Sequence, residues 1–382
     1  MIEFLTGAFS VLQIRGERIV KILEEKTDVP PSVVERCRSA AQNSLDLVDM
    51  VSDKKQTLAL IKKSLENGTI TSSQSEIPLK IVLLSYRDLR RTLDAIEEKF
   101  VGHIVRYNKS DLFFTRLAEV LWEETNLSDL PPIGVTNTEG YFCTWASMGI
   151  IFSPPSAEHN LLIFPDLYHE FGHILQQQIK FYGNNFRAEL KSHIAELKNQ
   201  IRRIGRPMEL KIIDDINYKW GEYWAEEAAC DTLATWVIGP AYGWCNLHLC
   251  LQNSTSYIHE GKHPADAART KHILRVLRRR GFGADADAIE KLWMRFNNIS
   301  QQLPSNYYQD YHPDGLFTAV MEDVEQSIKD NNIVGIEEGS QMIMLFNQAW
   351  KVFNENNENY NEWEEKTIAE LKARFKIGKP EN

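Results

Sequence analysis

Apolar residues recur every three or four positions over much of the chain, which is the spacing of one face of an α-helix. Residues 32–66 and 78–106 show this spacing, and a polar stretch rich in turn-forming residues separates them. The first 23 residues form an amphipathic pattern, and helical spacing returns after about Phe282 and continues to a charged tail. The pattern therefore predicts a largely helical protein.

The middle of the chain has a different pattern. The segment "GYFCTWASMGIIFSPP" is rich in aromatic and β-branched residues and ends at Pro154-Pro155, which is typical of strands. We expect a small β-sheet here, with a strand around Phe142–Ile151. An amphipathic helix follows from Pro165, and Asp166 is placed to cap its free backbone N–H groups.

Two further helices are predicted downstream. Residues 186–205 carry apolar side chains at alternating steps of four and three, which favours packing on a neighbouring helix: Leu190, Ile194, Leu197 and Ile201. A second helical pattern runs from Tyr218 and stops at Gly239-Pro240, a pair that ends helices.

Composition and charge narrow the class of protein. The 382 residues carry a net charge of −10, which argues against nucleic acid or an anionic membrane as the main partner. The basic run Arg278–Arg280 lies at a predicted helix end, where it complements the helix dipole. No apolar run approaches the length of a membrane span, and the five cysteines are scattered and odd in number. We expect a cytoplasmic protein without a disulfide framework.

The predicted helix after Pro165 carries the pattern His169-Glu170-x-x-His173. Histidines four residues apart lie one turn apart on the same face, so two imidazoles can bind one zinc ion. Glu170 stands beside them as the candidate general base. A catalytic zinc also needs a third protein ligand and an open position for water.

The third ligand is expected on the helix that begins near Tyr218. Glu227 and Asp231 are four apart and share a face, so Glu227 can reach the metal while Asp231 accepts the outer ring N–H of a zinc histidine. Glu226 is the alternative ligand, but it is rotated by about 100° and has no acid four residues on. Cys245, His248 and Cys250 are close in sequence, but no partner pair completes a four-ligand zinc site.

Together these motifs resemble the gluzincin class of zinc metallopeptidases. His263-Pro264, with Arg269 six residues after the histidine, is further similar to a motif of the CAAX prenyl protease and HtpX-like peptidases. The resemblance covers the chain from Tyr141 to Arg280, and it implies that His263 stabilises the tetrahedral intermediate while Arg269 supports the site. Those relatives are commonly embedded in membranes, so their prenylated substrates are not carried over.

The expected fold is thus mainly α with a small β-sheet (α+β). A zincin-like domain, residues 108–285, lies between helical regions 1–107 and 286–382. We expect one Zn²⁺ per chain and hydrolysis of a peptide or protein substrate, which an exposed strand edge could align. Tyr257, Tyr308 and Tyr311 remain open as helpers of the oxyanion. Two alternatives also stay open: a peptidase-like regulator that senses or cleaves one partner, bound through the N-terminal helices, and a catalytically inactive helical interaction protein.

Overall fold

The computed structural model describes residues 1–127, 130–137, 141–204, 210–251, 256–259, 261–300, 303–336 and 340–377. The chain divides into two compact units, Met1–Leu112 and Phe113–Asn382. Helices dominate both units, and the second also contains a small sheet. The prediction of a mainly helical protein with a small β-sheet is therefore confirmed.

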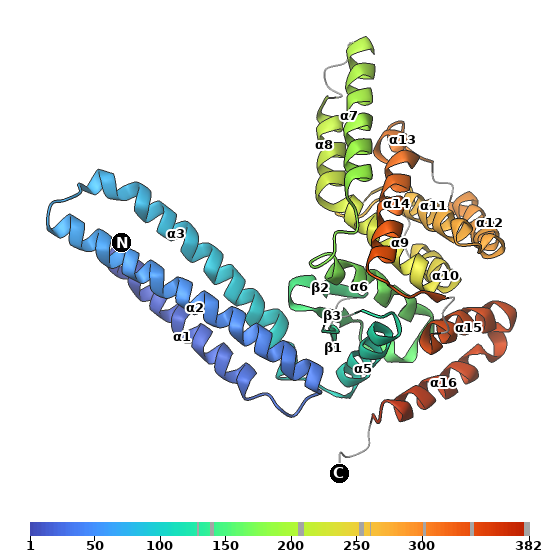
Figure 1. The fold of residues 1–382 in the computed structure, drawn as a ribbon, viewed down its shortest axis with the longest axis horizontal. Helices are drawn as coiled ribbons and strands as arrows, with labels where there is room; N and C mark the ends of the chain where they lie inside the picture. The colour runs from blue at the N-terminus through green and yellow to red at the C-terminus, as the bar shows by residue number, and fades with distance from the viewer. Residues whose placement is uncertain are drawn as a thin grey trace. The chain divides into compact units, whose positions relative to one another are not determined.

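The first unit is built from three long helices that lie side by side (Figure 1). They are α1 (Ile2–Glu24), α2 (Pro31–Glu66) and α3 (Ser72–Ala95), followed by a π-helical turn (Ile96–Val101) and α4 (Gly102–Ile104). Phe9 of α1 is fully buried and meets the ring of Tyr86 edge-on, with the ring centroids 5.3 Å apart. Apolar burial along one face of each helix thus holds the unit together.

Local sequence signals set the ends of these helices. Pro31 occupies the first turn of α2, where its missing N–H costs no hydrogen bond. Thr71 and Gln74 form a reciprocal capping box at the start of α3: Thr71 Oγ1 accepts from the Gln74 amide at 3.3 Å, and the Gln74 side chain accepts from the Thr71 amide at 2.8 Å. The predicted polar connection between the two helical stretches is thus a helix boundary.

The second unit begins with α5 (Lys109–Glu124), whose last twelve residues belong to it, and a three-stranded sheet of order β1-β3-β2. β1 (Ile133–Thr136) is parallel to β3 (Ile150–Ser153), with Ile133 opposite Ile150. β2 (Cys143–Trp145) is antiparallel to β3, with Cys143 opposite Phe152. The single strand expected around Phe142–Ile151 is therefore wrong. It is two short strands, because a tight turn at 146–148 ends in Gly149 with φ of +61°.

Helices make up the rest of the second unit. They are α6 (Leu167–Leu175), α7 (Asn184–Ile204), α8 (Leu210–Lys219), α9 (Ala225–Ile238), α10 (Pro240–Cys250), α11 (Asp266–Arg279), α12 (Gly283–Ser300), α13 (Tyr308–Tyr311), α14 (Asp314–Asp330), α15 (Gln341–Glu355) and α16 (Tyr360–Arg374). Helices from both ends of this stretch, from α6 to α16, contribute to one apolar core. α7 and α8 lie side by side, and α9 ends at Gly239-Pro240 as predicted (Figure 1). None of the described helices is both long and apolar enough to cross a membrane.

The start of α6 differs from the expectation. Asp166 precedes the helix but makes no capping hydrogen bond with its side chain. A 3-10 turn (Leu161–Asp166) leads into α6 instead, and Asn160 Oδ1 caps that turn by accepting from the Leu162 amide at 3.1 Å. Asp166 is buried and is thereby left free for a role at the site described below.

α6 and α9 cross in close contact at a glycine. A Cβ added at Gly172 would lie 2.8 Å from Cys230 Sγ and 3.0 Å from Cys230 Cα. No real Cβ tolerates such a contact with a backbone atom, so a side chain at position 172 forces the two helices apart. The glycine of the His-Glu-Phe-Gly-His segment therefore sets the distance between the two site-bearing helices.

Gly172→Ala should lower the midpoint of thermal unfolding, because overpacking a tight core contact costs about 1–3 kcal/mol. Gly221→Ala is the matched control, since nothing lies within 4 Å of a Cβ added at Gly221. The control should leave the midpoint unchanged or raise it slightly. Calorimetry of both variants checks this expectation, and an unchanged midpoint for Gly172→Ala would show that α6 and α9 are not tightly packed.

Candidate metal centre

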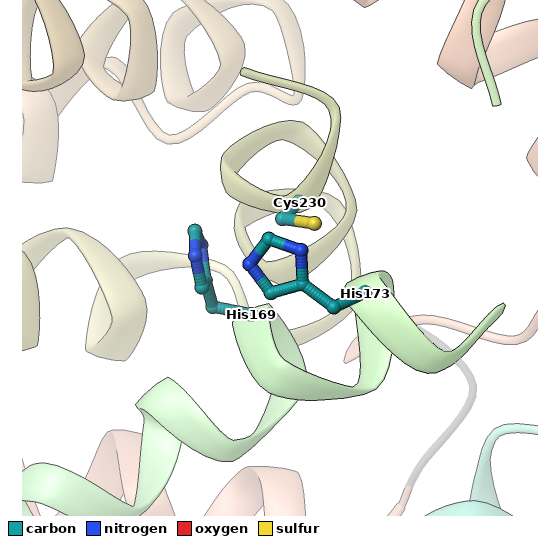
Figure 2. Close-up of side chains that lie close together, drawn as sticks. All are labelled: His169, His173 and Cys230. Carbon is teal, nitrogen blue, oxygen red and sulfur yellow. The ribbon is translucent and has the colours of Figure 1, made fainter. Parts of the chain in front are cut away.

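α6 and α9 bring three metal-binding side chains together. His169 and His173 extend from α6 and Cys230 from α9, and the three point toward one another (Figure 2). The two imidazole centroids are 5.0 Å apart, and one ligand atom from each of the three residues lies within 4.8 Å of the others. The group could hold a metal ion.

Each histidine is held by a carboxylate through its Nδ1 atom. His169 Nδ1 lies 3.0 Å from Asp231 Oδ1, and His173 Nδ1 lies 2.7 Å from Glu226 Oε1. A carboxylate on one ring nitrogen fixes the ring and leaves the other nitrogen as a metal ligand. Asp231 therefore lies where the sequence predicted it. Glu226 was considered only as a rival ligand, and its contact with the second histidine was missed.

The Nε2 atoms of both histidines face one carboxylate. Glu227 Oε2 is 3.3 Å from His169 Nε2, and Glu227 Oε1 is 3.6 Å from His173 Nε2. Ligand atoms about 2.0–2.1 Å from a tetrahedral zinc ion are about 3.3–3.4 Å apart. These separations fit a divalent metal between the two rings and Glu227.

Cys230 lies in the same cluster, although the sequence argument did not include it. Its thiol is fully buried, and burial together with the nearby Glu227 charge raises its pKa well above the ordinary value. Gln176 Nε2 donates to Cys230 Sγ at 3.4 Å. The one signal in the sequence was its position three residues after Glu227, which places both on one helix face.

Negative charge exceeds positive charge at this site. Four carboxylates are buried, those of Asp166, Glu170, Glu227 and Asp231, whereas Arg269 is the one guanidinium that reaches them. Arg269 Nε and Nη2 donate to the two Asp231 oxygens at 2.9 and 2.7 Å. Burial alone would raise the pKa of Asp231, but this guanidinium outweighs burial and lowers it well below the ordinary range.

The other carboxyls respond to burial without such a partner. Burial raises the pKa of Asp166 to about 7, and it also raises the pKa of Glu170. For His169, burial acts in the opposite direction, but hydrogen bonds to Asp231 and Glu227 raise its pKa well above the ordinary value. Uncompensated buried carboxylates are costly. The charge balance therefore favours a bound cation.

His263 joins the site from the segment before α11. Its Nδ1 lies 3.0 Å from Glu227 Oε2, and 55% of its side chain is exposed. Its Nε2 makes no hydrogen bond to a described residue. The predicted residues His169, Glu170, His173, Glu227, Asp231, His263 and Arg269 thus all meet at one place, brought together by α6, α9 and the start of α11.

A tyrosine that the sequence argument overlooked completes the surroundings of Asp231. Tyr242 of α10 donates to Asp231 Oδ1 at 2.6 Å, and its hydroxyl is 3.2 Å from His169 Nδ1. No spacing pattern linked α10 to the motifs, so only the tertiary structure reveals this contact. The tyrosines considered before have other partners: Tyr311 donates to Asp215, and the rings of Tyr257 and Tyr308 pack on each other.

No family model matches the chain, and no curated protein or solved structure matches it either. The likeness to gluzincins therefore rests on the motif residues and their spacing. The geometry reported above is independent of that likeness, because it follows from the positions of the side chains alone.

Three single variants distinguish the ligand candidates. Glu227→Gln should remove most of the bound zinc, whereas Glu226→Gln should weaken it about ten- to a hundredfold, because Glu226 contacts the metal only through His173. Cys230→Ala should bind zinc as the wild type does. Metal analysis and chelator competition measure all three, and a large loss in Cys230→Ala with none in Glu227→Gln would identify the thiolate as the ligand.

Proposed function

We propose that this protein is a zinc-dependent metallopeptidase of the gluzincin type, which hydrolyses peptide bonds. The observation that carries the proposal is the orientation of the two histidines: the outer nitrogens contact Asp231 and Glu226, and the inner nitrogens both face Glu227. Two imidazoles and one carboxylate are the ligand set of many catalytic zinc sites.

Glu227 is a better third ligand than Cys230. The carboxylate is within 3.6 Å of both Nε2 atoms, and it is already ionised, because hydrogen bonds to His169 and His263 outweigh the effect of burial and lower its pKa well below the ordinary value. A thiol binds zinc only as the thiolate, and burial opposes the loss of that proton in Cys230. Cys230 then serves as a small apolar residue against Gly172.

When bound, zinc would lower the pKa of a water and polarise the scissile carbonyl. Glu170 is the residue that takes and returns the proton. It is 6% exposed, its side chain accepts no hydrogen bond from a described residue, and burial raises its pKa toward the range of a general base. Because it adjoins His169 on the helix, it lies beside the ligands without being one.

His263 and Arg269 have separate roles in this proposal. The exposed ring of His263 offers Nε2 to the oxyanion of the substrate while Nδ1 stays on Glu227. Arg269 acts through Asp231, which it grips with two parallel hydrogen bonds, so it positions His169 and contacts no reacting atom. A planar guanidinium suits this task better than an ammonium.

The substrate class rests on the motif resemblance and on β2. This strand pairs with β3 on one side, lies at the edge of the sheet and packs near α6. An extended peptide can pair with the backbone of an edge strand, which would lead its scissile bond past the helix that carries Glu170.

Glu170→Gln should abolish hydrolysis while zinc content and thermal stability remain those of the wild type, because the change removes a base and no ligand. The assay is cleavage of casein or a peptide library with and without a chelator, alongside metal analysis. Wild-type turnover in Glu170→Gln would refute the assigned base. Zinc binding without any cleavage by the wild type would instead favour a sensing role.

His263→Ala should lower kcat by about a hundredfold or more with little change in KM or zinc content, because an oxyanion donor acts mainly in the transition state. His159→Ala provides the control, since that histidine is also more than half exposed and lies outside the site. Equal kcat values for the two variants would leave His263 with a structural role only.

A further inference from the structure

A second cavity lies on the far side of α11 from the metal centre. It has a volume of about 240 Å³ and is lined by residues of α11, α12 and α14 together with Tyr257 and Tyr308. Lys271, Arg275 and Arg278 line it, and at about 100° per residue they fall on the face of α11 roughly opposite Arg269. The cavity is therefore separate from the predicted site.

One wall carries a buried imidazole with an unused nitrogen. His272 is fully buried, and its Nε2 lies 2.7 Å from Thr232 Oγ1 and 3.2 Å from the Ala228 carbonyl. Thr232 Oγ1 itself donates to that carbonyl at 2.7 Å, so Nε2 carries the imidazole proton and donates. His272 Nδ1 is then an acceptor, and it has no hydrogen-bond partner among the described residues.

A second imidazole in the wall has no partner at either nitrogen. His312 is 4% exposed and stacks on Trp224, with the centroids 4.7 Å apart and the rings 21° from parallel. Burial lowers the pKa of His272 to about 4 and that of His312 to about 3. Both rings are therefore neutral at pH 7, and His312 offers one donor and one acceptor. Buried polar groups left unpaired cost about 1–3 kcal/mol each, which a ligand would recover.

The cationic side chains of the cavity are unevenly neutralised. Lys271 Nζ and Arg275 Nη2 share the single carboxylate of Asp314, at 2.8 and 2.7 Å. Arg278, in contrast, pairs with two acids, Asp287 and Glu290. Positive charge therefore exceeds negative charge at the Lys271 and Arg275 end, where an anionic group would be attracted.

We propose that this cavity binds a small aromatic carboxylate that also carries a hydroxyl or amino group. The remaining walls are aromatic, with Tyr257, Trp293, Tyr308 and Phe317, and suit a flat ring. An apolar cavity of about 150 Å³ already accommodates benzene, so the volume here holds a substituted single or fused ring. The hydroxyl or amino group would donate to His272 Nδ1, and the carboxylate would lie near Arg275. The proposal does not rest on the metallopeptidase function.

Calorimetric titration of the full chain with three probes tests the site. 4-Hydroxybenzoate should bind saturably with a Kd below about 1 mM, which is modest for a ligand of this size. Phenol lacks the anion and cyclohexanecarboxylate lacks the ring, so each should bind at least tenfold more weakly. Absence of saturable binding for 4-hydroxybenzoate would overturn the proposal, as would a soaked crystal with only water on the two imidazoles.

Two variants locate the binding. Arg275→Gln should weaken 4-hydroxybenzoate at least tenfold and leave phenol unchanged, whereas Arg38→Gln, at an exposed arginine of the first unit, should change neither. His312→Phe preserves the ring stack on Trp224 and removes both ring nitrogens, so it should weaken both phenolic probes. If His312→Phe does not fold, Arg275→Gln decides alone. Wild-type affinity in Arg275→Gln would contradict the proposal.

Discussion

The candidate site depends on the close crossing of α6 and α9. Gly172 lets the backbone of one helix approach Cys230 of the other, and this approach places the two histidines opposite Glu226, Glu227 and Asp231. Every other contact of the site follows from that spacing. A wider crossing would separate the imidazoles from their carboxylates, since hydrogen bonds of 2.7–3.0 Å tolerate little displacement.

The electrostatics of the site follow from the same crossing. It buries acidic side chains from both helices near one another, and Arg269 neutralises only Asp231. Such an arrangement is unfavourable by itself, because charges removed from water must be compensated. A divalent cation between His169, His173 and Glu227 would provide the compensation, and the same field would bring Glu170 into the range of a proton acceptor. Stability and proposed chemistry thus depend on one charge balance.

Helical spacing predicted the elements that carry the site, because positions four residues apart must share a helix face. That rule placed His169 with His173 and Glu227 with Asp231, and the helix stop at Gly239-Pro240 was equally readable. The rule failed where tertiary contacts decide. Glu226 reaches His173 because α9 crosses α6 at an angle that no helical wheel contains, and Tyr242 reaches Asp231 from a third helix. The side-chain cap predicted at Asp166 is absent, because a 3-10 turn precedes α6.

The central claim is that zinc binds between His169, His173 and Glu227, and X-ray absorption at the zinc edge tests it most directly. The zinc-loaded full chain should show nitrogen and oxygen scatterers at about 2.0–2.1 Å, with two imidazoles and no sulfur. A sulfur scatterer at about 2.3 Å would assign Cys230 as a ligand and contradict the account. A protein that retains no zinc after loading and dialysis would contradict it equally.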